Sequence, residues 1–130
     1  MLGSQARSDA LPLPLPRKVL VVDDEPDLAE LAQALLGHHG MEAIVAHGAA
    51  EALRMLATHA DIDALFSDVM MPGMTGLELA HATRTSYPRI RIVLTSGYTA
   101  PELIAGNATR YAFVAKPYRI ADVVRLLRQQ

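Results

Sequence analysis

The sequence predicts a single α/β domain built as a doubly wound sheet, with helices covering both faces of parallel strands. Short apolar runs, typical of strands buried on both faces, alternate along the chain with segments whose apolar residues recur at helical spacing. Strict alternation requires parallel strands joined by right-handed crossovers, and these crossovers place helices on both faces. A chain of 130 residues suits one such domain with a substantial core.

The composition excludes several classes of function. The net charge of -2 gives no general attraction to nucleic acids or acidic membranes. No cysteine is present, which excludes disulfides, thiol catalysis and cysteine zinc sites. No apolar run approaches the roughly 20 residues that span a bilayer, and the N-terminus lacks a signal-peptide pattern. We therefore expect a cytoplasmic protein that contacts neither nucleic acid nor membrane directly.

The N-terminal segment is polar and then alternates leucine with proline from Leu11 to Pro16. Alternating proline opposes both helix and interior strand, which predicts a flexible tail or linker over residues 1–16 and a domain over 17–130. A ligand for a proline-binding module is the functional alternative. The tail also suggests that the domain is tethered to something upstream.

The first strand and helix have clear signals. Lys18–Val22 is a continuous apolar run that stops at Asp23-Asp24-Glu25, and Pro26 then suits the first turn of a helix. Gly37 or Gly40 ends this helix. Its apolar stripe consists of Leu28, Leu31, Ala32, Leu35 and Leu36.

Four more strands alternate with four more helices, which gives five of each. The expected strands are 42–46, 64–67, 91–94 and 111–115, and the expected helices are 49–56, 77 to near 88, 101–106 and 120–127. The helix at 101–106 has the weakest signal because it is short and Gly106 interrupts it, so we expect it to be the most mobile.

Four of the five strands end in a polar side chain: Asp23 and Asp24, Asp68, Thr95, and Lys116. The carboxyl ends of parallel strands share one edge of the sheet, and ligands bind at that edge in open α/β sheets. Asp68 alone would equally suit a strand-end cap. Because four strand ends converge, the pattern instead predicts one cleft.

The charges in this cleft indicate phosphoryl chemistry. Crowded carboxylates repel one another, and Mg²⁺ removes that conflict because it binds oxygen ligands, often together with phosphate. Lys116 has the wrong sign to bind a metal but would neutralise phosphoryl oxygens. The Thr95 hydroxyl can donate to another oxygen. Asp68 is left as the nucleophile that forms an aspartyl phosphate.

Four runs, Val21–Glu25, Ser67–Gly76, Leu94–Gly97 and Ala115–Pro117, resemble the motifs of a response-regulator receiver domain of bacterial two-component signalling. The resemblance covers about residues 17 to 129. It implies a flavodoxin-like fold with strand order 2-1-3-4-5.

The resemblance also implies roles for the site residues. A phosphohistidine on a sensor histidine kinase or histidine phosphotransfer protein would phosphorylate Asp68. Mg²⁺ would be bound by Asp68, by Asp24 directly, by Asp23 through water and by the backbone carbonyl of Met70. Lys116 would contact the phosphoryl group, and its bond to Pro117 would be cis.

A switch follows from the same resemblance. Thr95 would move toward the phosphoryl group and Phe113 would turn inward behind it, although an aromatic residue in a strand also suits plain packing. The readout surface would comprise the fourth helix, fifth strand and fifth helix, with a weak phosphorylation-dependent dimer through it. The domain would act as a switch rather than a turnover enzyme.

Two departures from the commonest family pattern affect this interpretation. Thr75 stands where many members carry Asp, which we interpret as a variation of the loop cap. Met70 and Gly97 border the path of the hydrolytic water and cannot orient it by hydrogen bonding. We therefore predict slow to moderate self-dephosphorylation.

Two other functions are less consistent with the sequence. A magnesium-dependent phosphatase would need an acid/base Asp where Met70 stands. A flavin carrier would need a phosphate-binding loop where Asp23-Asp24-Glu25 stands. Both a stand-alone regulator and the receiver of a hybrid sensor kinase remain open. The proline-rich lead-in and the Thr-Ser-Gly-Tyr and Lys-Pro-Tyr runs favour the hybrid kinase.

Overall fold

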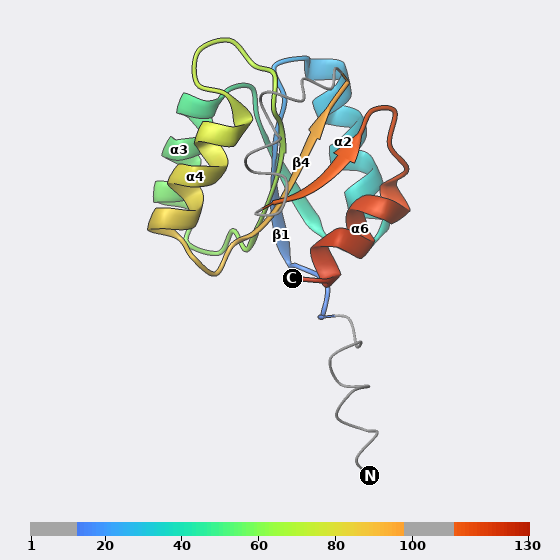
Figure 1. Cartoon of the computed structure of the whole chain (residues 1–130). Helices are drawn as coiled ribbons and strands as arrows, with labels where there is room; N and C mark the ends of the chain where they lie inside the picture. The colour runs from blue at the N-terminus through green and yellow to red at the C-terminus, as the bar shows by residue number, and fades with distance from the viewer. Residues whose placement is uncertain (1–12, 98–110) are drawn as a thin grey trace.

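The computed structural model describes residues 13–97 and 111–130, and its centre is a five-stranded parallel sheet (Figure 1). The strand order is β2-β1-β3-β4-β5. The strands are β1 (Lys18–Val22), β2 (Glu42–Ala46), β3 (Ala64–Asp68), β4 (Arg91–Ser96) and β5 (Ala112–Ala115). The expected fold class and strand order are therefore confirmed.

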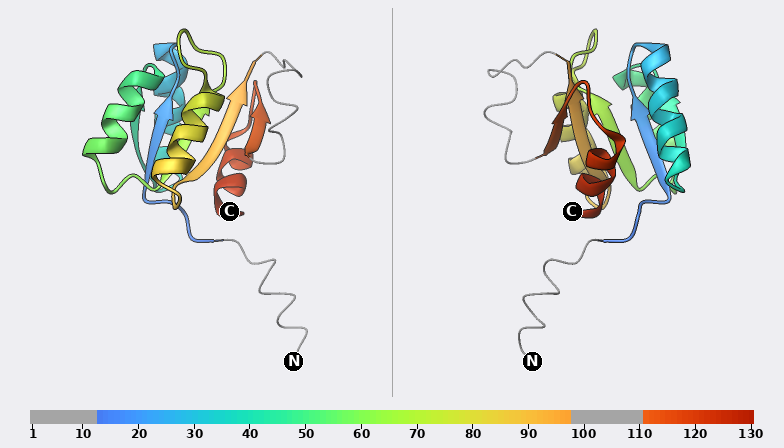
Figure 2. Two further views of the ribbon diagram at one scale, coloured as in Figure 1. Left: turned by 60° about the vertical axis from the view of Figure 1, so that its left-hand side comes forward. Right: turned by 90° about the vertical axis from the view of Figure 1, so that its right-hand side faces the viewer.

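Helices cover both faces of this sheet. Among the described residues they are α2 (Pro26–His38), α3 (Ala49–Thr58), α4 (Gly76–Ser86) and α6 (Ile120–Arg128). Figure 2 shows α3 and α4 on one face and α2 and α6 on the other. The structure thus describes four of the five expected helices, and the helix expected at 101–106 lies outside the described residues.

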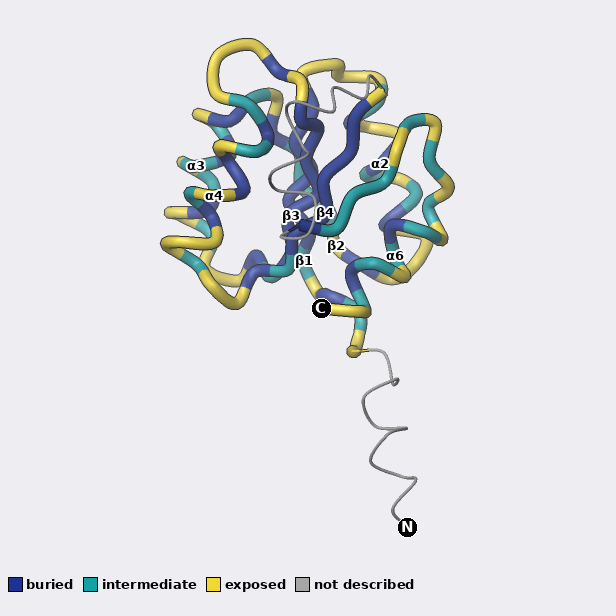
Figure 3. The backbone as a smooth tube through the Cα atoms, in the orientation of Figure 1, coloured by how far each residue is buried: buried dark blue, intermediate teal, exposed yellow. Residues whose placement is uncertain are grey.

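The core consists of two apolar layers because successive strand residues point to opposite faces. In β1, Leu20 belongs to the layer under α3 and α4, whereas Val19 belongs to the layer under α2 and α6. Both side chains are fully buried. The inner strands β1, β3 and β4 are almost continuously buried in Figure 3, whereas the edge strands β2 and β5 are mostly of intermediate exposure. Cover on both faces explains the uninterrupted apolar sequences of the inner strands.

The observed ends of the elements refine the expected ones. β3 includes Asp68, and β4 continues to Ser96, two residues beyond the expected end. Helix α2 runs through Gly37, and Gly40 with φ 90° follows its end. A left-handed backbone of this kind favours glycine, so Gly40 is the residue that ends the helix turn.

Residues 13–16, the last four of the expected tail, contact the folded domain. The Leu13 N–H donates to the Arg128 carbonyl at 2.6 Å, and Arg128 Nε donates back to the Leu13 carbonyl at 2.9 Å. Leu15 packs against the apolar layer under α2 and α6, and Pro16 is buried. The boundary expected at residue 17 therefore leaves out four residues that contact the domain, while residues 1–12 lie outside the described part of the chain.

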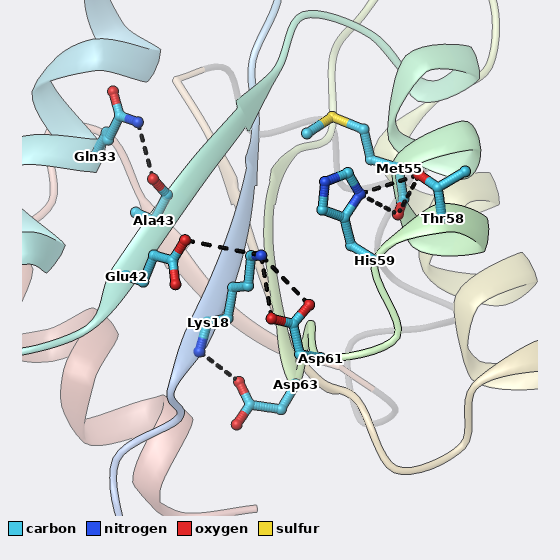
Figure 4. Close-up of polar contacts among 9 residues, drawn as sticks. All are labelled: Lys18, Gln33, Glu42, Ala43, Met55, Thr58, His59, Asp61 and Asp63. Carbon is cyan, nitrogen blue, oxygen red and sulfur yellow. Dashed lines mark hydrogen bonds and ion pairs between the residues drawn. The ribbon is translucent and has the colours of Figure 1, made fainter.

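Polar groups at the amino edge of the sheet pair with one another (Figure 4). Lys18 Nζ lies 3.2 Å from Asp61 Oδ2 and 3.7 Å from Glu42 Oε2. The Asp63 carboxylate accepts hydrogen bonds from the backbone N–H groups of Arg17 and Lys18, both at 2.9 Å.

In the described part of the chain, no helix combines the length and hydropathy needed to cross a membrane.

Candidate phosphoryl-acceptor site

Three buried polar side chains meet at the carboxyl edge of the sheet. Asp68 ends β3 and lies directly opposite Thr95 of β4 in the strand register, while Asp23 follows the last residue of β1. The exposed fractions are 6% for Asp23, 5% for Asp68 and 3% for Thr95. Apolar strands carry these polar groups into the protein interior, so each needs a partner there.

The three aspartates expected to bind metal lie together. Asp23, Asp24 and Asp68 each offer one carboxylate oxygen, and these oxygens lie within 4.8 Å of one another. Asp24 is exposed, whereas the other two are buried. A purely oxygen donor set with several carboxylates suits a hard divalent cation such as Mg²⁺. The residues present therefore fit the expected metal.

Lys116 brings the opposite charge to the same point. Its Nζ lies 3.2 Å from Asp23 Oδ2 and 3.2 Å from Asp68 Oδ2. The backbone N–H of Lys116 donates to the Ser96 carbonyl at 3.0 Å, which fixes the residue at the end of β5. The Lys116–Pro117 peptide bond is cis, as expected.

The remaining carboxylate oxygens are held by local backbone groups. Asp23 Oδ1 accepts from the Glu25 N–H at 2.9 Å, and Asp68 Oδ1 accepts from the Met70 N–H at 3.2 Å. Each carboxylate thus has one oxygen bound to its own loop and one bound to Lys116. These four contacts fix the orientation of both carboxylates.

Burial and the paired charges together shift the pKa values of Asp68 and Lys116. It raises the pKa of the Asp68 carboxyl above its ordinary value, because the opposing attraction of Lys116 is partly offset by repulsion from Asp23. For Lys116, burial acts to lower the pKa, but the attraction of Asp68 and Asp23 outweighs it and the pKa is raised. The lysine is therefore firmly cationic, whereas the carboxylate charge on Asp68 is disfavoured.

The Thr95 hydroxyl is the unexplained polar atom of the site. Its Oγ1 is buried and has no hydrogen-bond partner among the residues described. A buried hydroxyl without a partner is unfavourable by about 1–3 kcal/mol. Thr95 lies opposite Asp68 in the strand register, so its hydroxyl is free to donate to an oxygen acceptor held at Asp68.

The loop after β3 depends on Gly76 and Thr75. A Cβ at Gly76 would collide with the carbonyl of Asp68, so only glycine allows α4 to start this close to the strand end. Thr75 caps α4: its Oγ1 accepts from the Glu78 N–H at 3.2 Å, and the Glu78 side chain accepts from the Thr75 N–H at 2.8 Å. The interpretation of Thr75 as a cap is confirmed.

Phe113 and Met70 lie beside this cluster. Phe113 of β5 pairs in register with Leu94, one position before Thr95, and packs partly buried against the layer under α3 and α4. The Met70 side chain is 43% exposed at the start of the loop. Neither side chain belongs to the group of charges around Lys116.

Two further side chains lie beside the site, and sequence reasoning missed the first of them. The His47 ring Nδ1 lies 3.4 Å from the Asp23 carbonyl, and His47 follows the end of β2, the one strand end that was not counted. Tyr118 packs edge-on against Phe66 of β3. It also lines a groove of about 360 Å³ together with Leu28, Leu31, Leu35, Lys116 and Pro117.

The chain matches the family model of the response regulator receiver domain over residues 19–128. It is 37% identical over 115 residues to the probable transcriptional regulatory protein TcrX of Mycobacterium tuberculosis, covering 87% of this chain and 49% of TcrX. It is 34% identical over 113 residues to the response regulator MprA of Mycobacterium ulcerans, covering 85% of this chain and 48% of MprA. The chain thus spans about half the length of these relatives.

Solved structures agree with this match. A response regulator receiver protein from Pseudomonas putida superposes with a TM-score of 0.78 at 27% identity, covering 91% of this chain and 100% of that one. The response regulator TrrA of Thermotoga maritima, solved in complex with Mg²⁺-BeF, superposes with a TM-score of 0.73 at 29% identity. The match covers 82% of this chain and 92% of the TrrA chain.

Proposed function

Because this chain belongs to the response regulator receiver domain family, we propose that it is a phosphoacceptor switch of a two-component phosphorelay. In this proposal Asp68 accepts a phosphoryl group from a phosphohistidine, with Mg²⁺ as the cofactor. The observation that carries the proposal is the position of Lys116, whose Nζ lies 3.2 Å from both Asp23 and Asp68. Opposite Asp68 lies the buried Thr95 hydroxyl, which has no hydrogen-bond partner in the described part of the chain.

The transfer assigns one task to each side chain. A carboxylate oxygen of Asp68 attacks phosphorus, and the phosphorus–nitrogen bond of the donor breaks with its electron pair moving to the imidazole nitrogen. Lys116 already contacts Asp68 and would contact the arriving phosphoryl oxygens. Asp23, Asp24, Asp68 and the Met70 carbonyl would bind Mg²⁺, which supplies further neutralisation of phosphoryl charge.

The switch uses the hydroxyl of Thr95. This buried hydroxyl has no acceptor within residues 13–97 and 111–130, and a phosphoryl oxygen on Asp68 would supply one. Such a bond favours a state in which Thr95 moves toward Asp68. Phe113 lies one register position away on the neighbouring strand and would fill the space that this movement releases. The readout surface would comprise the expected fourth helix, which lies outside the described residues, together with β5 and α6. The weak dimer would use the same surface.

The partner in this proposal is a sensor histidine kinase or a histidine phosphotransfer protein, in the cytoplasm. The protein would not be a turnover enzyme, since it catalyses only its own phosphorylation and slow dephosphorylation. TcrX and MprA are named as regulators, so these names give no support to the preference for a hybrid kinase.

A phosphodonor of low molecular weight tests the proposal without a partner. The protein is incubated with phosphoramidate and Mg²⁺, and the labelled residue is located by mass spectrometry. We expect label on Asp68, none without Mg²⁺ and none in Asp68→Asn. A parallel beryllofluoride titration followed by NMR should shift signals at Thr95 and Phe113 in the wild type only. Label on another residue would contradict the proposal.

A further inference from the structure

Tyr118 connects the loop that carries Lys116 to the strand that carries Asp68. Its ring lies 5.2 Å from the ring of Phe66, centroid to centroid, at an interplanar angle of 84°. This edge-to-face arrangement is the preferred geometry for an aromatic pair. Phe66 is 2% exposed and lies two residues before Asp68 in β3, so it is a rigid anchor.

The connection between β5 and α6 is short, so the contact of Tyr118 with Phe66 strongly restricts the position of Lys116 in the same connection. Only residues 116–119 separate the end of β5 from the start of α6. At the start of this connection, the Lys116 N–H is bound to the Ser96 carbonyl. Two residues later, the Tyr118 ring is bound to Phe66. Lys116 is therefore fixed from both sides.

A lysine needs this support to act at a defined point. Its ammonium group sits on a flexible four-carbon stem, so the position of the charge depends on what fixes its backbone and stem. Here Nζ reaches two carboxylates at 3.2 Å although its side chain is only 17% exposed. Tyr118 and Lys116 line the same groove, so the ring also limits the space into which the stem can move.

The phenol itself is suited to packing rather than to chemistry. Burial raises the pKa of Tyr118, and the charges of Asp23 and Asp68 act in the same direction against the opposing effect of Lys116. The hydroxyl therefore stays neutral beside the acidic cluster. Tyr118 would act through its ring and not as a proton donor or nucleophile.

We propose that Tyr118 is a positioning residue for phosphoryl transfer: its ring, packed on Phe66, holds Lys116 where the ammonium group contacts Asp68. This inference rests on the proposed phosphoacceptor function. It extends that function by assigning the aromatic after the Lys-Pro pair to the transfer step.

Three variants test the role of the ring. Tyr118→Leu keeps apolar bulk but loses the edge-to-face contact, so phosphorylation by phosphoramidate should slow by about tenfold, in line with the effect of small misplacements of catalytic groups. Tyr118→Phe keeps the ring and should restore the wild-type rate. Tyr87→Leu is the matched control, because Tyr87 follows the end of α4 and packs on the core outside the site. This control should leave the rate unchanged.

A double-mutant cycle asks whether Tyr118 acts through Lys116. In a Lys116→Ala background, Tyr118→Leu should lower the rate no further, because the group that it positions is gone. A plain structural defect would lower the rate by the same factor in both backgrounds. Tyr118→Met serves as a second substitution if Tyr118→Leu does not fold, and Mg²⁺ affinity measured by calorimetry should not weaken in any folded Tyr118 variant.

The outcomes separate this inference from the proposed function. If wild-type protein takes no label on Asp68, the proposed function fails and the role of Tyr118 falls with it. If wild type is labelled and Tyr118→Leu reacts at the same rate, only the role of Tyr118 is overturned. The role is also overturned if Tyr118→Phe is as slow as Tyr118→Leu, or if the effect persists in the Lys116→Ala background.

Discussion

Lys116 Nζ contacts Asp68 Oδ2 at 3.2 Å, and this contact joins the last residue of one strand to a loop that begins 48 residues later in the chain. The same nitrogen lies 3.2 Å from Asp23, so one cation balances two buried carboxylates. The stability of the domain and its reactivity with phosphate therefore depend on the same side chain.

Replacing Lys116 with methionine should affect both properties. Two buried carboxylates lose their partner, so the free energy of unfolding at neutral pH without Mg²⁺ should fall by about 3 kcal/mol. Mg²⁺ should recover part of this loss. Phosphorylation should slow by about 100-fold, as on removal of one oxyanion donor. Urea unfolding and mass spectrometry measure the two effects.

Lys18→Met is the control for this substitution. Lys18 pairs with Asp61 and Glu42, whose side chains are 68% and 65% exposed at the opposite edge of the sheet. The Lys18 side chain is only 12% exposed, but both of its carboxylate partners remain in water when it is replaced, so no buried charge is left without a partner. Stability should therefore fall by only about 0–1 kcal/mol, and phosphorylation should not change. Equal losses from Lys116→Met and Lys18→Met would contradict a special role for the buried contact.

Asp68→Asn should stabilise the protein at neutral pH. Burial raises the pKa of Asp68, so the folded state binds its proton more tightly than the unfolded state does. This carboxylate therefore disfavours folding above its folded pKa, and the penalty disappears as the pH falls to the ordinary value of 3.8. The gain in free energy of unfolding from Asp68→Asn, measured by urea unfolding, should therefore shrink as the pH falls from neutral to 3.8.

Asp61→Asn supplies a control of opposite sign. The hydrogen bond from Lys18 lowers the pKa of Asp61, so its carboxylate favours folding above the ordinary value and loses that contribution as the pH falls. Asparagine at this position should be neutral or slightly destabilising at neutral pH. If Asp68→Asn and Asp61→Asn changed the free energy of unfolding in the same direction across the pH range, burial would not be the cause of the raised pKa at Asp68.

Strand ends were the most predictable part of the site. Asp23, Asp68 and Thr95 each follow or end an apolar run, and parallel strands must bring their carboxyl ends to one edge. The position of Lys116 at the same edge was predictable for the same reason, because it directly follows the last strand. The fold class was predictable for a related reason, because uninterrupted apolar strands require cover on both faces.

Contacts between distant side chains were not predictable. The Leu-Pro alternation describes local backbone preference, and it contains no sign that Leu13 pairs with Arg128 at the other end of the chain. The packing of Tyr118 on Phe66 likewise depends on how a loop crosses a neighbouring strand. The Thr95 hydroxyl lacks a partner among the residues that the structure describes, and this depends on a side-chain orientation that no sequence pattern encodes.

Thr95→Val should stabilise the unphosphorylated protein while abolishing the switch. Valine keeps the branched shape and removes a buried hydroxyl that has no partner among the described residues, for a gain of about 1 kcal/mol. The beryllofluoride-dependent shift of Phe113 in NMR spectra should disappear. Thr83→Val is the control: its buried hydroxyl donates to the Leu79 carbonyl at 2.8 Å, so the same change should destabilise by about 1 kcal/mol. A loss of stability in Thr95→Val would show that its hydroxyl is satisfied.

Residues 13–16 should contribute to stability although the sequence predicted a tail. A chain beginning at residue 17 loses the paired hydrogen bonds of Leu13 with Arg128, the contact of Arg91 with Pro14 at 2.5 Å and the packing of Leu15. Its free energy of unfolding should be about 1–2 kcal/mol below that of a chain beginning at residue 13. Arg128→Ala in the longer chain should reproduce part of the difference. Equal stability of the two chains would mean that these contacts contribute nothing.

Met70→Asn should shorten the lifetime of the phosphorylated state. The Met70 side chain is 43% exposed directly after the site, and a thioether cannot orient a water molecule for attack on phosphorus. An asparagine amide can donate and accept at the same position, so phosphate loss should accelerate by roughly tenfold. Met74→Asn is the matched control, because Met74 is 39% exposed in the same loop and should leave the lifetime unchanged. Timing the loss of label from Asp68 measures both. An unaltered lifetime in Met70→Asn, or an equal acceleration in Met74→Asn, would show that position 70 does not control the attacking water.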